Sequence, residues 1–136
     1  PNSAEREEMG FSRAWLHHKG RNKHHYEYWI DYSLKGGPGG MAPAPMPRCY
    51  IAEMVMDRIA ACKVYQGEKY ADTAPLAYFM CGRDPAPMHE CTRESLGMLL
   101  TMLAEKGEKE TFRFIKNDFY CFMFFIKFMF MWERKN

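Results

Sequence analysis

Two stretches of the chain repeat apolar residues at helical spacing, and this feature limits the fold more than any other. Residues 48–65 and 92–107 carry apolar side chains three or four positions apart: Ile51, Met54, Val55 and Ile59 in the first stretch, and Leu96, Leu99, Leu100 and Leu103 in the second. This period is typical of an α-helix that buries one face. A chain of 136 residues has room for one domain with a modest core. We therefore predict an all-α fold, a compact bundle of about five to six helices.

Residues that start and stop helices extend this prediction to the rest of the chain. Small polar residues favour helix starts, and glycine favours helix ends. We expect helices at residues 3–19, 24–33 and 48–65, one that Asp72 or Thr73 starts and that ends near Met80, and one that Thr92 starts and that ends near Gly107. The stretch 36–47 is rich in glycine and proline, so we expect a flexible loop that forms neither helix nor strand.

The composition indicates a folded protein in a reducing compartment. Apolar residues make up 47% of the chain and aromatic residues 15%, which excludes wholesale disorder. Five cysteines, an odd number without a CxxC pair, favour reduced thiols over a disulfide framework. The sequence shows no secretory signal, and we expect a cytoplasmic protein. A net charge of +2 provides no general attraction to nucleic acids or acidic membranes, so we expect neither as a partner.

The chain is expected to divide near residue 110. Residues 1–110 would form a histidine-rich helical domain that lacks an upstream helix, because the sequence opens with proline on a charged helical stretch. Residues 111–136 would form an apolar C-terminal segment. Within it, residues 119–132 are almost continuously apolar but fall short of the roughly twenty residues that a bilayer span needs. A buried last helix, a partner-binding face that forms a homo-oligomer, a weak membrane anchor and a frame read past its proper end stay open as explanations.

Histidines are concentrated in one short stretch. Four of the five lie within nine positions, as two pairs, His17-His18 and His24-His25. Neighbouring residues on a helix point about 100° apart, so both members of a pair rarely face one ion. Gly20, followed by Arg21 and Asn22, is expected to break the helix, so that one histidine from each pair can converge. On the first helix, we expect His18 to point inward with Trp15.

Two acidic residues follow on the predicted helix 48–65. Glu53 and Asp57 are four residues apart, so their carboxylates lie one above the other and repel unless a cation or a proton lies between them. Their apolar neighbours favour partial burial of both side chains. Imidazoles together with carboxylates are the ligands that a divalent metal site needs. We expect metal or phosphate chemistry here, with packing and polar capping at helix ends as the competing explanation.

The histidine stretch is also basic. Between Met9 and Tyr26 the chain has four lysine or arginine residues and no acidic one. Such a stretch attracts phosphate groups, and a solvated basic face explains it equally well. Because aromatic residues nearby can stack on bases, nucleic-acid binding is a further function class. The near-neutral net charge argues against it.

The segment FSRAWLHHKGRNKHHYEYW, followed by MP and EMVMD, resembles a bacterial and phage domain family of unknown function. Members of that family share an AWxHHxxxNxHHxxYW block, an MPxxxxxEMxxDW block and a later HPxT-like turn. The resemblance covers residues 11–104. This chain differs from the family in its loop 36–45, in Arg58, where the family usually has an aromatic residue, and in lacking an upstream helix that carries His-Asp and Ser-Lys. Its final thirty residues have no counterpart in the family.

The order of ligand types in the complete family pattern is similar to that of the all-helical HD-type metal-dependent phosphohydrolases. This resemblance implies that one or two divalent ions (Mn, Fe, Zn, Ni or Mg) bind to side chains from both pairs and from the later helix: His17 or His18, His24 or His25, and Asp57. Glu53 and Asn22 would orient the ligand histidines, and Arg21 and Lys23 would hold the phosphate.

The function implied by this resemblance is a metal-dependent phosphohydrolase-like domain that acts on a nucleotide or another phosphate ester. The ion would polarise a phosphoryl oxygen and lower the pKa of a bound water. Without the upstream His-Asp pair the site would be incomplete. The alternative is a non-catalytic helical interaction or structural module of bacterial or phage origin, whose histidines and aromatic residues form a rigid polar core.

Overall fold

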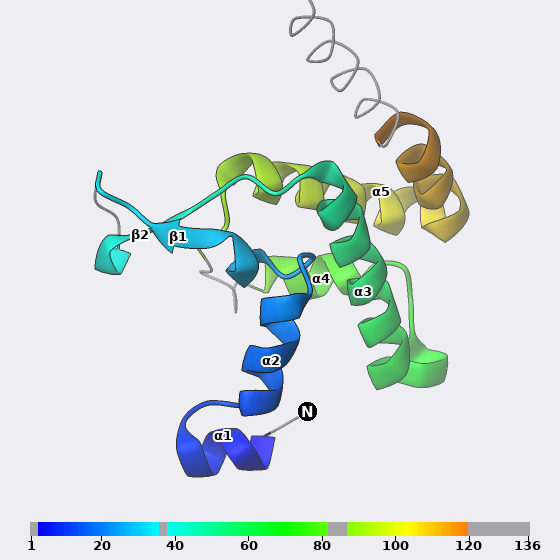
Figure 1. Cartoon of the computed structure of the whole chain (residues 1–136). Coiled ribbons are helices and arrows are strands. Elements are labelled where there is room, and N and C mark those ends of the chain that lie inside the picture. Colours follow the sequence, from blue (N-terminus) through cyan, green and yellow to red (C-terminus); the bar gives the residue numbers. More distant parts are fainter. Residues whose placement is uncertain (1–2, 36–37, 82–86, 120–136) are drawn as a thin grey trace, which may run out of the picture.

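The computed structural model describes residues 3–35, 38–81 and 87–119. Over these residues the chain is mainly helical and has a small antiparallel sheet of two strands (Figure 1). The elements are the helices α1 (Ser3–Met9), α2 (Arg13–Arg21), α3 (Arg48–Gln66), α4 (Ala74–Met80) and α5 (Glu90–Phe114), and the strands β1 (Ile30–Tyr32) and β2 (Met41–Pro43). Short 3₁₀ helices at Tyr26–Trp29, Pro38–Gly40 and Gly67–Lys69 and a π-helical turn at Ile115–Phe119 connect or extend them.

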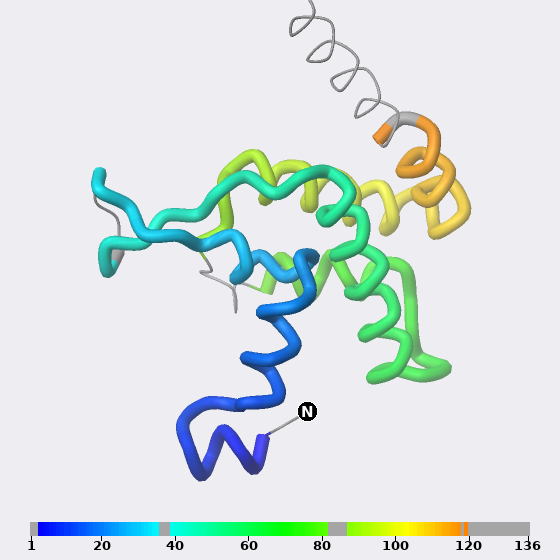
Figure 2. The backbone as a smooth tube through the Cα atoms, viewed as in Figure 1, coloured from blue at the N-terminus to red at the C-terminus, as the bar shows by residue number. Residues whose placement is uncertain are grey.

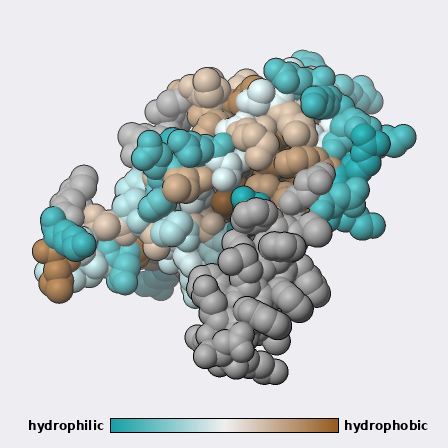
Figure 3. Space-filling view, turned by 90° about the horizontal axis from the view of Figure 1, so that it is seen from above, coloured by the Kyte–Doolittle hydropathy of each residue, from teal (hydrophilic) through white to brown (hydrophobic). Residues whose placement is uncertain are grey.

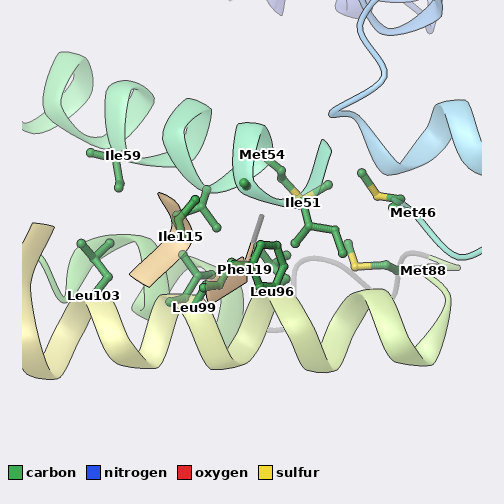
Figure 4. Close-up of a cluster of buried hydrophobic side chains, with 13 residues drawn as sticks. Met46, Ile51, Met54, Ile59, Met88, Leu96, Leu99, Leu103, Ile115 and Phe119 are labelled. Atoms are coloured by element: carbon green, nitrogen blue, oxygen red, sulfur yellow. The ribbon is translucent and has the colours of Figure 1, made fainter. Parts of the chain in front are cut away.

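Packing of α3 against α5 forms the hydrophobic core. The leucine stripe of α5 is fully buried, and the apolar stripe of α3 faces it (Figure 4). Side chains from neighbouring segments complete the core, which consists of Met46, Ile51, Ala52, Met54, Val55, Ile59, Met88, Leu96, Leu99, Leu100, Leu103, Ile115 and Phe119. The helix predicted at residues 48–65 and the buried leucine face are confirmed. The chain is mainly helical, as predicted, with a small sheet that the all-α prediction lacks, and the compact bundle stays a prediction.

α5 is bent at Gly107, where the backbone has φ +78° and ψ 173°. Only glycine adopts this conformation readily, and a Cβ atom at this position would lie 3.2 Å from Asp72 Oδ2. Beyond the bend, the Thr111 hydroxyl donates a hydrogen bond to the Gly107 carbonyl oxygen (2.9 Å). The chain then returns to the core, where Ile115 and Phe119 lie between α3 and α5 (Figure 4). The helix end predicted near Gly107 is therefore a break within α5, after which the helix resumes.

The first predicted helix, residues 3–19, is two helices. α1 ends at Gly10, whose φ of +76° is typical of a glycine at a helix end, and its N–H bonds back to the carbonyl four residues earlier (2.9 Å). α2 then starts from the buried Ser12, whose hydroxyl accepts a hydrogen bond from Trp15 N (3.1 Å). The prediction of one helix is wrong because it passed over Gly10, whose positive φ ends α1.

The segment between α2 and α3 contains a β-hairpin, so the predicted helix 24–33 and the strand-free loop 36–47 are both wrong. The strands pair in the register Ile30 with Pro43, Asp31 with Ala42 and Tyr32 with Met41. Gly39 and Gly40 both have positive φ, +63° and +73°, which lets the chain reverse direction before β2. Strands of three residues are too short to show an alternating pattern, so the sequence does not predict them.

Thr92 hydrogen-bonds the start of α5 to the segment before α3, and it is not the helix cap that the sequence predicted. α5 begins after His89, whose Nδ1 accepts a hydrogen bond from Cys91 N (3.3 Å). Thr92 lies inside the helix and is 1% exposed. Its hydroxyl accepts a hydrogen bond from Met46 N (2.9 Å), in the segment that leads into α3. This buried bond fixes the start of α3 relative to the start of α5.

The remaining helices lie around this core. α4 packs against α3 and α5, and it matches the predicted short helix, with Thr73 before it and Pro75 in its first turn. α1 and α2 extend away from the core, and the chain at the end of α2 comes back to α3 (Figure 2). Seen from above, a group of apolar side chains lies near the middle of the molecule, and hydrophilic side chains gather on the side to the right of it (Figure 3).

Several predictions concern the ends and surface of the chain. In the described ranges no helix is both long and apolar enough to cross a membrane. Cys49, Cys62, Cys81 and Cys91 are free thiols. Buried residues lie on both sides of the domain boundary expected near residue 110, and the division itself stays a prediction. Most of the apolar stretch 119–132 lies outside the described residues.

Replacing Thr92 with valine should lower the free energy of unfolding by about 1–3 kcal/mol, because valine keeps the side-chain shape but leaves Met46 N without its buried acceptor. Thr101→Val is the matched control, because Thr101 lies on the same helix and is exposed. Its replacement should change stability by less than about 0.5 kcal/mol. Chemical denaturation of the three proteins gives both values. Equal stability of Thr92→Val and the wild type would show that this bond does not hold α3 to α5.

Candidate metal centre

The second histidine pair lies in the short segment that joins α2 to the 3₁₀ helix Tyr26–Trp29. Asn22 ends α2, and its backbone N–H (3.2 Å) and its side-chain amide (2.7 Å) both donate to the His18 carbonyl oxygen. The Asn22 carbonyl oxygen accepts a hydrogen bond from His25 N (3.1 Å). These bonds turn the chain at the end of α2 and bring His25 back toward His18. The helix break expected at Gly20 occurs at Asn22.

Trp29 fixes the other end of this segment. Its indole N–H donates to the Lys23 carbonyl oxygen (2.7 Å). Its own carbonyl oxygen accepts from Ala44 N (2.7 Å), which extends the pairing of β1 with β2. The indole also packs on Tyr50 of α3, with ring centroids 5.6 Å apart. The segment is thereby attached to both the hairpin and α3.

Three of the four paired histidines come together. One ring nitrogen of each of His18, His24 and His25 lies within 4.8 Å of the other two. The ring centroids of His24 and His25 are 4.3 Å apart, and those of His18 and His25 are 4.8 Å apart. Trp15 meets the ring of His25 edge to face, at 4.8 Å. His17 is exposed and is not part of this group, because it projects from a different side of α2.

Burial leaves ring nitrogens of this histidine cluster without partners. His24 is 7% exposed, and its Nε2, like that of His25, is buried with no hydrogen-bond partner in the described part of the chain. His24 Nδ1 lies 3.1 Å from Glu53 Oε1 of α3, which is ion-pair distance without hydrogen-bond geometry. His18 is exposed, so the prediction that it points inward is wrong. It lies at the end of α2, away from the core that α3 forms with α5.

The other side chains expected at the site lie around the cluster. Asn22 Nδ2 is 3.3 Å from Nδ1 of His18. Asp57 lies one turn after Glu53 on α3, where its charge acts on His25, but it is outside the group of three. Glu53 and Asp57 are both exposed, so the predicted partial burial is wrong. The buried face of α3 is the one that turns toward α5, and the two acids are on another face.

The two residues expected to hold phosphate do not line the pocket beside the cluster. Arg21 is exposed at the end of α2. Lys23 places its ammonium group over the rings of Tyr28 (5.7 Å) and Tyr50 (5.8 Å). Neither side chain is among those that line the pocket. Arg21 and Lys23 are both exposed, and they make the surface at the end of α2 basic.

The environment of His25 keeps its ring neutral. Burial, followed by the neighbouring rings of His24 and His18, lowers the pKa of His25 to about 4, and the carboxylate of Asp57 opposes this only in part. At pH 7 the ring of His25 is therefore uncharged. A neutral imidazole is the form that coordinates a metal ion.

The spacing of the three nitrogens fits a metal ion after a small adjustment. In a tetrahedral site with Zn–N distances of about 2.0 Å, the ligand nitrogens are about 3.3 Å apart. The three nitrogens here lie within 4.8 Å of one another, so the widest pair would close by about 1.5 Å, a movement that rotation of the imidazoles provides. Three imidazoles leave a fourth position open, as in catalytic zinc sites.

A pocket of about 600 Å³ lies beside the cluster, between residues 22–29 (the histidine segment), α3 and α4. Its polar lining includes His24, His25, Glu27, Asp57 and Arg58, and most of the remaining lining is apolar or aromatic. The sequence predicted no role for Glu27 or Arg58. Two signals point to Arg58: it lies directly after Asp57 on the same helix, and it stands where the resembling family usually has an aromatic residue.

Lowering the pH from 6.5 to 4 should destabilise the metal-free chain through His25. An unfolded histidine takes up a proton below about pH 6.5, whereas folded His25 stays neutral down to about pH 4. The unfolded state thus binds more protons in this window, and the unfolding free energy should fall as the pH falls. The fall should be less steep in His25→Gln. Denaturation curves of both proteins with a chelator, across this pH range, give the slopes, and identical slopes would contradict a neutral His25.

Comparison with protein-family models places the chain in a family. The model of a family of unknown function, DUF5662, matches residues 1–102, which include the whole histidine cluster and α3. Neither the curated proteins nor the solved structures give a match. The resemblance to a family of unknown function is confirmed at this level, and the similarity to HD-type phosphohydrolases stays a prediction. This chain belongs to the family of unknown function DUF5662.

Proposed function

We propose that the chain binds a divalent transition-metal ion at the cluster of His18, His24 and His25, and that this ion is the metal centre of a phosphate-ester hydrolase. The observation that carries the proposal is the convergence of three ring nitrogens within 4.8 Å, in a cluster with two buried Nε2 atoms that have no hydrogen-bond partner among the described residues. Buried polar atoms without partners cost free energy, which coordination to an ion would offset.

The donor set favours particular metals. Imidazole nitrogens suit Zn, Fe and Ni, whereas Mg prefers oxygen ligands, so we propose one of the first three. Glu53 supports the assignment, because its carboxylate lies 3.1 Å from His24 Nδ1, where a small rotation of the ring would let Nδ1–H donate to it and turn Nε2 toward the ion. Asp57, the other acid of α3, lines the pocket and acts on His25, and we assign it as an oxygen ligand, with a water in a fifth position.

The surroundings of the cluster suit a phosphate ester. A bound ion would polarise a phosphoryl oxygen and lower the pKa of a coordinated water. The exposed side chains of Arg21 and Lys23 make the solvent side of the segment basic, which favours the approach of an anion. The pocket of about 600 Å³ beside the cluster has room for the organic part of the ester.

A non-catalytic polar core is the competing function, and ring packing favours it. The imidazoles of His18, His24 and His25 pack on one another and on Trp15 at the distances of aromatic pairs. In that case the histidines stabilise the fold and bind no ion. Replacing them would then lower stability equally with and without metal.

Replacing His24 with alanine should weaken zinc binding by at least about 100-fold, because loss of a direct ligand costs more than loss of a group that only orients one. His17→Ala is the matched control, since His17 belongs to the same two pairs but lies outside the cluster, and its affinity should equal that of the wild type. Glu53→Gln should weaken binding by about 10- to 100-fold. Calorimetric titration of the metal-stripped proteins with Zn²⁺ gives the affinities.

Two results would count against the proposal. Equal zinc affinity in the wild type, His24→Ala and His17→Ala would exclude the cluster as the metal site and leave the polar-core function. Zinc binding as predicted, with no hydrolysis of any ester in a panel of phosphate monoesters and diesters, would refute the hydrolase while leaving the metal centre. Fe²⁺- and Ni²⁺-loaded chains belong in the same hydrolysis assay, because the imidazole donors suit Zn, Fe and Ni alike.

A further inference from the structure

The pocket beside the histidine cluster has aromatic walls on several sides. Trp15 comes from α2, Tyr65 from α3, and Tyr78 and Phe79 from α4. Its volume of about 600 Å³ falls within the range of ordinary small-molecule sites, about 300–1,000 Å³. Aromatic faces on different elements favour a flat ring that packs against them.

The cationic side chain of Arg58 lies against two of these aromatic residues. The centre of its guanidinium group lies 5.7 Å from the ring centroid of Tyr78 and 5.9 Å from that of Phe79. Its Nε is buried and has no hydrogen-bond partner among the residues that the structure describes. A guanidinium group is always charged, so an acceptor on a ligand would relieve a donor that is otherwise buried without one.

Glu27 is the counterpart of Arg58 on the histidine segment. Its Oε2 is also buried without a hydrogen-bond partner in the described ranges, and its side chain lines the same pocket. The two unpartnered atoms do not satisfy each other. One is a donor and the other an acceptor. A ligand that satisfies both needs at least one acceptor and at least one donor.

We propose that Arg58 and Glu27 recognise a planar nitrogen heterocycle in this pocket, so that the preferred ester carries such a ring on its organic part, as a nucleotide does. The inference rests on the proposed function, because the histidine cluster would hold the phosphate of the same ligand. A nucleobase combines flat faces with donors and acceptors along its edge. A simple aryl group lacks that edge, and a sugar lacks the flat faces.

Binding of free nucleosides to the metal-stripped full chain tests the inference separately from the metal. The probes are adenosine, guanosine, cytidine and uridine, with phenol and ribose as controls, titrated by calorimetry. At least one nucleoside should bind with a Kd below about 1 mM, the upper end of ordinary substrate constants. Phenol and ribose should bind at least about 10-fold more weakly, because each lacks either the edge or the flat faces that the pocket requires.

Variants identify the two recognition groups. Arg58→Met and Glu27→Gln should each weaken nucleoside binding by about 10- to 100-fold. Arg58→Lys should weaken it as well, because lysine keeps the charge but has no Nε–H, and it serves if the methionine variant does not fold. The matched controls are Arg6→Met and Glu68→Gln, at exposed positions outside the pocket, and they should bind as the wild type does.

Two outcomes overturn the inference: no nucleoside binds up to about 1 mM, or the wild type and all variants bind equally. Zinc titration of the same preparations separates it from the proposed function. Zinc binding without nucleoside binding overturns the inference alone. Nucleoside binding that depends on Arg58 and Glu27, without zinc binding, supports the recognition pair and overturns the metal centre.

Discussion

Packing of α3 on α5 sets the position of the α3 side chains that face the histidines. The leucines of α5 are 0% exposed, and the buried bond between Met46 N and Thr92 fixes where α3 begins. Helix side chains project at intervals of about 100°, so burial of one face of α3 turns its other faces outward. Those faces carry Glu53, Asp57 and Arg58. The packing of α3 on α5 therefore turns two acidic residues and one arginine of α3 toward the segment that carries the histidines.

The histidine segment is held by its backbone and by Trp29, while the imidazoles contribute few hydrogen bonds to its position. Asn22 closes the turn at one end, and the Trp29 indole bonds to the Lys23 carbonyl oxygen at the other. Buried Nε2 atoms of His24 and His25 therefore remain available for another partner. Burial lowers the pKa of His25 to about 4, so its ring is neutral at pH 7 and one of its two nitrogens can accept or coordinate. The proposed metal ion would be such a partner.

The sequence predicted α3 and the buried face of α5, because their apolar spacing is a local property of the chain. It did not predict the hairpin, because strands of three residues show no alternation. Which member of the first histidine pair joins the cluster depends on where α2 ends, and the hydrogen bonds of Asn22 determine that end. Arg58 was not predicted to line a pocket, because its surroundings come from α4, far along the chain. The metal itself stays a prediction of the histidine pattern.

X-ray absorption spectroscopy at the zinc edge, on the zinc-loaded chain, tests the convergence of three imidazoles on one ion most directly. We predict three imidazole nitrogens at about 2.0–2.1 Å, with oxygen in the remaining positions. Imidazole gives a recognisable scattering pattern from its outer ring atoms, so the ligands can be counted. Zinc bound by oxygen or sulfur, with at most one imidazole, would contradict a metal centre built from His18, His24 and His25.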